Sequence, residues 1–169
     1  MSASLPKIAL RITTQWRRFE QLSSAALYEL LRFRQQIFVV EQRSPYPDLD
    51  GLDQAAWHLL GRADGNFAAY LRLLPPGDAM PAVRIGRVAV AAAMRREGVG
   101  RGLMTEALGL CRERYPRQPI RLSAQLHLAR FYESLGFTAT AAPYDDFGVA
   151  HVEMAMSPAT TLPPECLSP

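Results

Sequence analysis

The sequence has little of what marks membrane, metal-binding or disulfide-stabilised proteins. Only two of its 169 residues are cysteines, Cys111 and Cys166, and they form neither a metal-ligand spacing nor a disulfide framework. No run of about 18 apolar residues is present, and the first ten residues lack the apolar core of a signal peptide. We therefore expect a soluble cytoplasmic protein with no bound metal and no membrane partner.

Blocks of one charge are also missing. The formal net charge is +3, and no five consecutive residues carry the same charge. This mild positive charge favours small anionic ligands over a nucleic-acid partner. The arginines are also not interleaved with aromatic residues, as they often are in nucleic-acid-binding surfaces. A hydrophobic content of 49% in 169 residues indicates one globular domain with one core.

The hydrophobic pattern alternates between the periods of strands and helices. The Asp64-Gly65 pair predicts a hairpin turn, and Ser23 or Ser24 would cap a helix that contains Leu27. The expected strands cover residues 8–13, two runs within 55–78, 82–92, 119–125 and two runs within 138–157. The other helices are expected from residue 103 to Tyr115-Pro116 and over 126–137, with Gly136 as the C-cap.

The order β-α-β-β-β-α-β-α-β-β predicts an α/β (α+β) fold, with a mixed sheet that carries helices on its faces. The domain would cover residues 1–157, and the proline-rich residues 158–169 would form a loose tail. Residues 41–53 contain two prolines and a glycine without periodicity, which predicts a long loop. Long loops in compact domains are often functional.

The segment "MRREGVGRG", residues 94–102, lies between an expected strand and an expected helix. Such a turn directs free backbone N–H groups and the positive end of a helix dipole at one point, where an anion fits. Glycines at 98 and 100 let a phosphate approach the backbone, and arginines add charge. A tight turn with solvated arginines is the alternative. The expected phosphate-binding residues are Arg95, Arg96, Gly98, Val99, Gly100, Arg101 and Gly102.

The spacing of these glycines excludes two common phosphate motifs. No lysine follows them, as a Walker A motif requires, and Leu103 stands where the dinucleotide fingerprint needs its third glycine. The remaining pattern, Arg95-x-x-Gly98-x-Gly100, resembles the [QR]-x-x-G-x-[GA] motif of the GCN5-related N-acetyltransferase (GNAT) superfamily. The order of elements around it also agrees with that superfamily.

A second motif supports this resemblance. In the family pattern N-x-x-A-x-x-x-Y-x-x-x-G-F, the chain matches with Tyr132, Gly136 and Phe137, and departs with Gln125 and Leu128. The resemblance implies a GNAT-like single domain with a mostly antiparallel sheet. It also implies transfer of the acetyl group of acetyl-CoA to an amine, by direct attack in a ternary complex.

Two further segments resemble the ElaA-like branch of the superfamily. "LRFRQQIFVVEQRSPYPDLDGLD", residues 31–53, is similar to its R-x-x-V-F-V-V-E-Q-x-x-x-Y-x-x-x-D segment, and "DDFGVAHVEM", residues 145–154, to its E-D-G-I-P-H-x-x-M segment. The chain departs at Ser44, where the branch often has cysteine, and at Phe147 and Ala150, where it has Asp and Pro.

The resemblance implies roles for several groups. The backbone of Val88, Ala89 and Val90 would bind the pantetheine arm, with the Val90 N–H as donor to the thioester oxygen. Gln125 would also lie at the coenzyme. Tyr132 would donate to the leaving thiolate, although its spacing also fits an amphipathic core position.

The general base is chosen among titratable residues of the segments that the family uses around its acceptor. The candidates are Glu41, His58, His127, Asp145, Asp146 and His151. A single histidine is more often structural than catalytic. His151 is the first choice because it lies in a matched motif and suits neutral pH, and Glu41 is the second. The acidic residues 48–53 could attract a cationic amine, although solvated carboxylates are the commoner explanation.

Two alternative functions stay open. The segment "RQQIFVVEQ" also resembles the start of acyl-homoserine-lactone synthases, which carry out another reaction on the same fold. A non-catalytic acyl-CoA-binding module would retain the same motifs without turnover. The identity of the amine, whether a small molecule or a protein, is not predicted, and a homodimer is a candidate because edge strands often pair.

Overall fold

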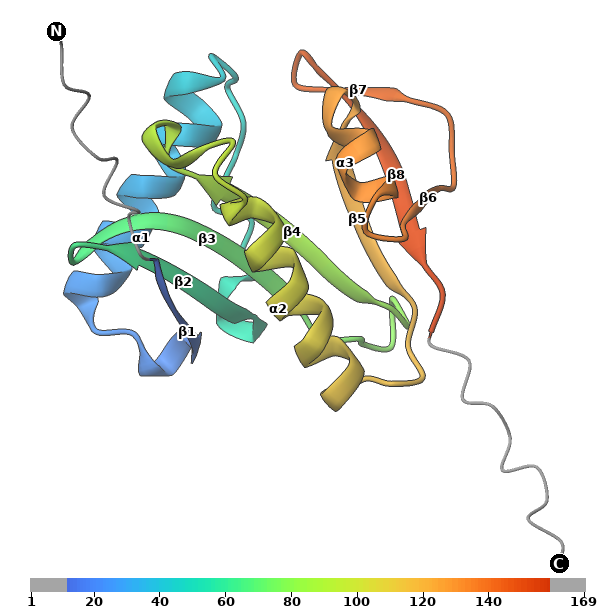
Figure 1. Cartoon of the computed structure of the whole chain (residues 1–169), viewed down its shortest axis with the longest axis horizontal. Helices are drawn as coiled ribbons and strands as arrows, with labels where there is room; N and C mark the ends of the chain where they lie inside the picture. Colours follow the sequence, from blue (N-terminus) through green and yellow to red (C-terminus); the bar gives the residue numbers. More distant parts are fainter. Residues whose placement is uncertain (1–11, 159–169) are drawn as a thin grey trace, which may run out of the picture.

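The structure, a computed structural model that describes residues 12–158, contains an eight-stranded sheet (Figure 1). The strands follow the order β1-β2-β3-β4-β5-β8-β6, and β7 also pairs with β8. Neighbours are antiparallel except β4 and β5, so the predicted mixed, mostly antiparallel sheet is confirmed. The strands are β1 (Thr13–Arg18), β2 (Trp57–Ala63), β3 (Asn66–Leu74), β4 (Val83–Val90), β5 (Ile120–Gln125), β6 (Thr138–Ala139), β7 (Tyr144–Asp146) and β8 (Val149–Met156).

Helices cover both faces of this sheet. They are α1 (Ser24–Gln35), which continues as a π-helix over Gln36–Glu41, α2 (Val99–Arg114) and α3 (Ala129–Glu133). The predicted caps are confirmed. The Ser23 hydroxyl accepts a hydrogen bond from the Ala26 amide at 3.2 Å, and Gly136, with φ +98°, lets the Phe137 amide bond to the Tyr132 carbonyl.

Near both ends of the chain, the strands differ from those expected. The first strand was expected over residues 8–13, but β1 begins at Thr13, and residues 8–11 lie outside the described part. Two strands were expected within 138–157, but three are found there, because the chain bends twice before β8. Of the expected tail 158–169, only residue 158 is described.

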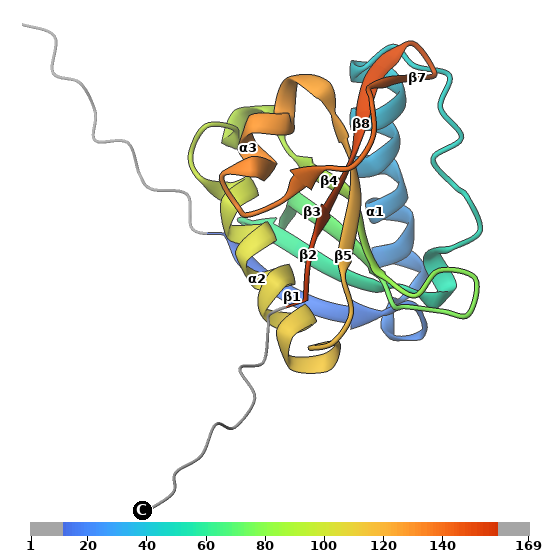
Figure 2. The same cartoon turned by 90° about the vertical axis from the view of Figure 1, so that its right-hand side faces the viewer.

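Apolar side chains form separate cores on the two faces of the sheet. Figure 2 shows α1 on one face and α2 and α3 on the other. The larger core joins Leu59, Leu71 and Leu73 of the sheet to α2 and α3, and the smaller one lies under α1 around Leu30 and Tyr70. Cys111 is buried in the larger core, and burial raises its pKa to about 12, so its thiol is unreactive at neutral pH.

The fourth strand contains a β-bulge. Arg72 of β3 pairs with Gly86, whereas Tyr70, two residues earlier, pairs with Ala89, three residues later. One extra residue is therefore accommodated in β4. Arg87, at this point, has φ +52°, a left-handed conformation that non-glycine residues rarely adopt.

The bulge reverses which side chains face α2. Val83 and Ile85 belong to the larger core, and strict alternation would send Ala89 there as well. Instead Val88 and Val90 pack against the larger core, and Ala89 belongs to the smaller one. The apolar pattern of the sequence changes phase at the same place, a signal that the expectation of one uniform strand over residues 82–92 ignored.

The two parallel strands of the sheet separate soon after they meet. Their paired residues are Val83 with Ile120 and Arg84 with Arg121. Beyond these pairs, β4 and β5 diverge (Figure 1). We call this separation, between residues 86–90 of β4 and 123–125 of β5, the wedge. None of the helices within residues 12–158 is long and apolar enough to cross a membrane.

Candidate active site

The edge of β4 that borders the wedge carries backbone groups without a strand partner. The Ala91 amide donates to the Ala68 carbonyl of β3 at 2.8 Å. Because consecutive amides of a strand point to opposite edges, the Val90 N–H points away from β3, into the wedge. The Val90 carbonyl, on the same side, accepts a hydrogen bond from Arg95 Nε at 2.9 Å.

The glycine-rich turn forms the N-terminus of α2, next to this edge. Gly98 has φ +79°, and its carbonyl accepts the helical bond from the Gly102 amide at 3.0 Å. The amides of residues 99–101 come before that bond and have no partner within the helix. A Cβ built on Gly100 would lie 3.8 Å from Phe131 Cζ and 4.0 Å from Val90 Cγ2, so this position faces the wedge.

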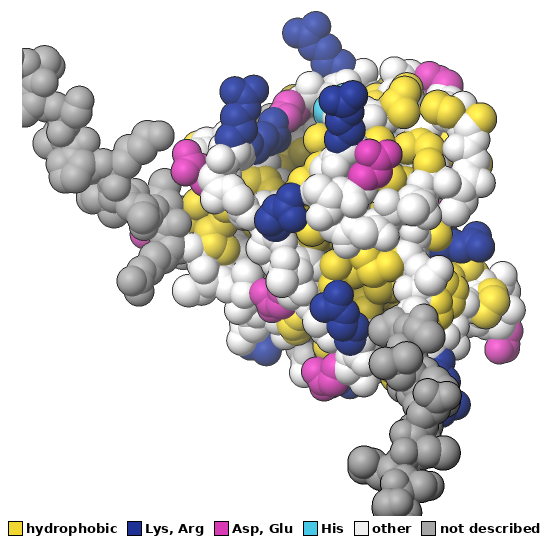
Figure 3. Space-filling view, turned by 45° about the vertical axis from the view of Figure 1, so that its right-hand side comes forward, with side chains coloured by type: hydrophobic (Ala, Val, Ile, Leu, Met, Phe, Trp, Pro, Cys, Tyr) yellow, Lys and Arg dark blue, Asp and Glu magenta, His cyan; other side chains and the backbone are white. Residues whose placement is uncertain are grey.

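The three arginines around the turn differ in their contacts. Arg95 holds both carboxylate oxygens of Glu41, at 2.7 and 3.0 Å. Arg101 donates to the Ser134 hydroxyl at 2.7 Å, whereas Arg96 is exposed and forms no ion pair within residues 12–158. Figure 3 shows basic side chains gathered around the upper part of the face that carries α2 and α3. Two of the three expected anion-binding charges thus already have protein partners.

Tyr132 combines a packed ring with an unpaired hydroxyl. Its side chain on α3 is 6% exposed, and its ring contacts Phe131 and Phe137 edge-on. Among the described residues, its hydroxyl has no hydrogen-bond partner. Burial raises the pKa of Tyr132 to about 12, so the phenol stays protonated at neutral pH and can act as a donor.

The structure removes one of the candidate bases. His58 is 0% exposed, with Nε2 2.9 Å from the Asp53 carbonyl and Nδ1 2.7 Å from the Tyr70 hydroxyl. A carbonyl only accepts, so Nε2 carries the hydrogen and Nδ1 accepts from Tyr70. Burial lowers the pKa of His58. Its candidacy as a base was wrong, because both ring nitrogens are used inside the protein.

The other two histidines are accessible. His127 is exposed. His151 of β8 is partly buried, with Nδ1 2.8 Å from the Val149 carbonyl. That carbonyl fixes the hydrogen on Nδ1, so the neutral ring has its lone pair on Nε2, as a proton acceptor requires. Gln125 lies opposite His151 in the β5–β8 register.

The acidic segment 48–53 is also not what the sequence suggested. Asp48, Asp50 and Asp53 alternate with three arginines in a closed ring, in which each charge has two partners of opposite sign. The ion pairs are Arg34 with Asp48 (2.9 Å) and Asp53 (2.7 Å), Arg72 with Asp50 (2.6 Å) and Asp53 (2.9 Å), and Arg87 with Asp48 (2.7 Å) and Asp50 (3.0 Å). We call these six residues the charge ring.

The charge ring explains the ionisation of its carboxylates. Burial by itself would raise the pKa of Asp50 and Asp53, but hydrogen bonds and charges from the arginines outweigh it, and both pKas lie below the usual value. Asp48 and Asp53 are buried among these arginines, and the exposed Asp50 also pairs with two of them. The interpretation of the segment as solvated carboxylates is therefore wrong for Asp48 and Asp53, and the charge of all three is already balanced by arginines.

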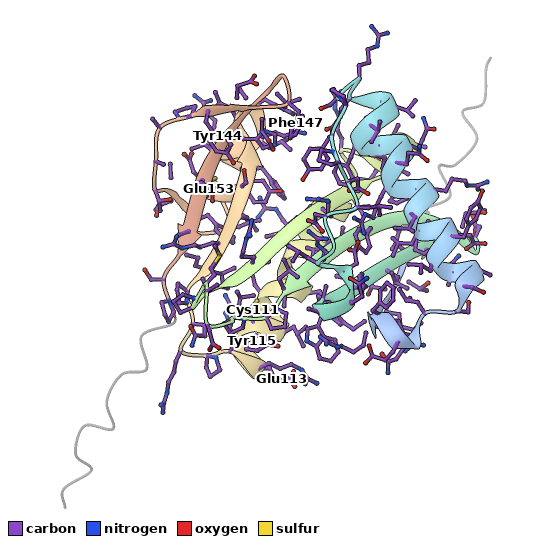
Figure 4. All side chains as sticks on the ribbon, turned by 180° about the vertical axis from the view of Figure 1, so that it is seen from behind. Cys111, Glu113, Tyr115, Tyr144, Phe147 and Glu153 are labelled. Atoms are coloured by element: carbon purple, nitrogen blue, oxygen red, sulfur yellow. The ribbon has the colours of Figure 1, made fainter. Side chains whose placement is uncertain are left out.

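The charge ring fixes a loop that reaches across to the turn between β7 and β8. The Ser44 hydroxyl donates to the Phe147 carbonyl at 3.0 Å, and the rings of Tyr46 and Phe147 meet edge-on at 5.6 Å. Arg87 lies over the Tyr46 ring at 4.8 Å. Figure 4 shows Phe147 at the turn that approaches this loop. The two segments that resemble the ElaA-like branch thus touch each other.

Sequence reasoning missed a second polar group on this face. The Tyr144 hydroxyl lies 2.5 Å from Ser123 Oγ and donates to Glu153 Oε1 at 2.9 Å. Figure 4 shows Tyr144 and Glu153 close together on the face that is seen from behind, where α1 also lies. Strand alternation was the available signal, because Glu153 follows His151 by two residues and therefore shares its face.

Within residues 12–158, no group of three or more His, Cys, Asp or Glu residues is arranged to hold a metal ion. The wedge is bordered by the free edge of β4, next to the N-terminus of α2. Asp145 accepts from the Gly148 amide in the β7–β8 turn, so it supports that turn.

Comparison with known proteins agrees with this geometry. Residues 28–158 match the family model of the acetyltransferase (GNAT) domain. The ElaA protein of Escherichia coli is 42% identical over 137 residues, which cover 80% of this chain and 90% of that protein. A UPF0039 protein of Synechocystis is 41% identical over 146 residues, 86% of this chain and 95% of that protein.

Solved structures give the same result. The crystal structure of an acyl-CoA N-acyltransferase from Pseudomonas aeruginosa superposes with a TM-score of 0.82 at 37% identity, and that of Escherichia coli ElaA with 0.82 at 40%. Each alignment covers 87% of this chain and 100% of the other. The chain therefore belongs to the GNAT acetyltransferase superfamily, in its ElaA-like branch.

Proposed function

We propose that this protein is an N-acetyltransferase that takes the acetyl group from acetyl-CoA and transfers it to an amine by direct attack in a ternary complex. The observation that carries the proposal is the wedge. β4 and β5 pair at two positions and then separate, and the free edge of β4 stands beside the N-terminus of α2. Membership of the GNAT superfamily supports the same reaction class.

The residues around the wedge suit the donor. Acetyl-CoA supplies a reactive thioester on a long arm that ends in a pyrophosphate. The amides of Val99, Gly100 and Arg101 would hold the pyrophosphate, helped by the exposed charge of Arg96 and the small Gly102. The backbone edge of residues 88–90 would bind the arm, with Gln125 on the facing strand.

The chemistry then assigns a proton path. The amine nitrogen bonds to the acetyl carbon while the bond from that carbon to sulfur breaks. His151 Nε2 takes the ammonium proton, the Val90 N–H donates to the carbonyl oxygen, and Tyr132 donates a proton to the departing sulfur. Glu41 is the second candidate base, weakened by the hold of Arg95 on both of its oxygens. We place the reaction in the cytoplasm and keep a homodimer as a prediction.

A screen of amines with acetyl-CoA tests this function. The release of free thiol is followed for amino acids, diamines, aminoglycoside antibiotics and peptides with free N-termini or lysines. We expect release that depends on the acceptor and a product heavier by one acetyl group. If acetyl-CoA binds but no amine causes release, the proposal fails in favour of an acyl-CoA-binding module. Release only with long acyl chains would favour the synthase-like alternative.

A further inference from the structure

Glu153 differs from Glu41 and from the carboxylates of the charge ring. The charge ring contains Asp48, Asp50 and Asp53, each with two arginines, and Glu41 is held by Arg95. Glu153 is partly buried, and its hydrogen-bond partner is the neutral Tyr144 hydroxyl. It forms no ion pair within residues 12–158. Because no cation among the described residues neutralises this partly buried carboxylate, the position suits a cationic ligand.

The register of the strands places Glu153 beside the wedge, on the strand next to β5 and level with the point where β5 has left β4. It lies opposite Ser123, which is two residues beyond the last β5 residue that pairs with β4, Arg121. His151 lies opposite Gln125, closer to the open end. Residues two apart in a strand are separated by about 7 Å and share a face. The backbone positions of the proposed base and of Glu153 are therefore about 7 Å apart, and the two side chains lie on one face.

Neighbouring groups complete a surface for a cation. The rings of Tyr144 and His151 lie 6.2 Å apart, and Phe147, whose ring meets Tyr46, lies in the turn between their two strands. Burial raises the pKa of Tyr144, and the charges of Glu153 and Asp146 add to this effect, so Tyr144 stays a neutral donor. Aromatic faces and carboxylates together favour ammonium groups.

We infer that Glu153, positioned by Tyr144, binds a second ammonium group of the acceptor, so that the preferred acceptor is a linear diamine whose nitrogens lie about 7 Å apart. The nitrogen at His151 receives the acetyl group, and the other nitrogen remains charged at Glu153. This inference rests on the proposed function. A diamine with four or five carbons between its nitrogens is the appropriate probe.

Paired acceptors test the inference. We measure kcat and KM for such diamines and for the monoamines of the same length, with wild-type protein, Glu153→Gln and Glu113→Gln. Glu113 is an exposed residue near the C-terminal end of α2, so its variant removes the same charge away from the wedge (Figure 4). We expect wild type and Glu113→Gln to prefer the diamine at least tenfold in kcat/KM, and Glu153→Gln to lose that preference through KM.

Binding gives a readout that does not depend on turnover. Calorimetric titration of the diamine should show at least tenfold weaker affinity for Glu153→Gln than for Glu113→Gln. In Tyr144→Phe we expect a smaller loss of affinity, because Glu153 keeps its charge but loses its hydrogen bond.

Equal losses for diamine and monoamine would overturn the inference and leave Glu153 a structural partner of Tyr144. If wild type acetylates monoamines without preferring diamines, the inference fails while the proposed function stands. If no amine is acetylated, the proposed function fails, and equal diamine affinity in the two variants would then overturn the inference as well.

Discussion

The proposed donor side and the proposed acceptor side of the wedge are built from different kinds of atoms. On the donor side, consecutive backbone amides at the start of α2 and the free edge of β4 provide the polar groups. On the acceptor side, the polar groups are side chains contributed by β5, β7, β8 and the loop after α1. A helix N-terminus presents its amides whatever its side chains are, whereas a side-chain cluster exists only when several elements meet.

This difference predicts how each side responds to substitution. Changes on the donor side should alter the binding of acetyl-CoA or the fate of its sulfur while the fold stays intact. Changes in the charge ring should lower the stability of the fold, because the six residues of the ring join α1, β3, β4 and the loop between α1 and β2. The acceptor side, which this loop reaches, should lose its structure first.

The largest effect is expected from Arg34→Met in the charge ring. Arg34 is 0% exposed and holds Asp48 and Asp53. Its removal leaves two carboxylates with one arginine each, and breaking a buried ion pair in this way costs about 3–5 kcal/mol. Urea unfolding measures this loss. The matched control is Arg32→Met, an exposed residue of the same helix, which should change the free energy of unfolding by at most about 0.5 kcal/mol.

The same variant has a signature in pH. The folded pKas of Asp50 and Asp53 lie below the ordinary value of 3.8, so their stabilisation is complete above that pH and is lost as the pH falls through the folded values. Wild-type stability should therefore decrease below about pH 4, and less steeply in Arg34→Met. A stability loss under about 1 kcal/mol, with an unchanged acid dependence, would show that the ring stabilises little.

The elements of the proposed donor side could be predicted from the sequence because their signals are local. The glycines 98 and 100, Tyr132 and the Gly136 cap all lie within single short segments, and the structure has the glycines at the start of α2, Tyr132 in α3 and Gly136 just after it. The charge ring could not be predicted in this way, because its bonds join residues 14 to 39 positions apart. The bulge at Arg87 depends on register with β3. Periodicity within one segment carries no information about such contacts.

The next largest effect is expected on the donor side, from Tyr132→Phe. The substitution keeps the ring and its packing against Phe131 and Phe137 but removes the hydroxyl that would donate a proton to the sulfur. General acid catalysis contributes about 10² to 10⁴ in rate, so kcat should fall by at least roughly tenfold, with little change in acetyl-CoA affinity. Stability should hardly change, since the hydroxyl has no partner among residues 12–158.

Steady-state kinetics on an acceptor for which chemistry is rate-limiting measures this effect. The control is Tyr115→Phe at the C-terminal end of α2, where the Tyr115 hydroxyl accepts a hydrogen bond from Trp57 Nε1 at 3.3 Å. Its kcat should equal that of wild type. Wild-type turnover by Tyr132→Phe would mean that solvent protonates the thiolate and that Tyr132 is a core residue.

An intermediate effect is expected on the acceptor side, from His151→Ala. The neutral ring offers Nε2 to the ammonium proton, because the Val149 carbonyl holds the hydrogen on Nδ1. Acid protonates Nε2, so kcat/KM should decrease toward low pH in wild type. In His151→Ala this decrease of kcat/KM at low pH, the acidic limb of the pH profile, should flatten. At neutral pH kcat/KM should be lowered by roughly tenfold, with acetyl-CoA affinity nearly unchanged. The exposed His127, changed to alanine, should retain the limb. If the limb persists in His151→Ala, the proton goes to Glu41, an aspartate or a water chain.

An effect of the same order as that of His151→Ala, but on binding alone, is expected from Gly100→Val in the first turn of α2. In the structure a Cβ at this position meets Phe131 and Val90 only at ordinary contact distances, so the substitution introduces no clash at Cβ, and urea unfolding of the variant checks that the fold is kept. The branched side chain would instead fill the space through which a pyrophosphate reaches the amides of residues 99–101. We expect the affinity for acetyl-CoA, measured by titration calorimetry, to fall by about tenfold, or 1.4 kcal/mol.

Gly109→Val, in the exposed middle of the same helix, makes the same change of residue with no atom within 4 Å of the new Cβ, and should bind acetyl-CoA as wild type does. Because a backbone site tolerates changes of side chain unless they block the approach of the ligand, the contrast between the two glycines tests whether the amides themselves bind the donor. Equal affinities would place the pyrophosphate elsewhere.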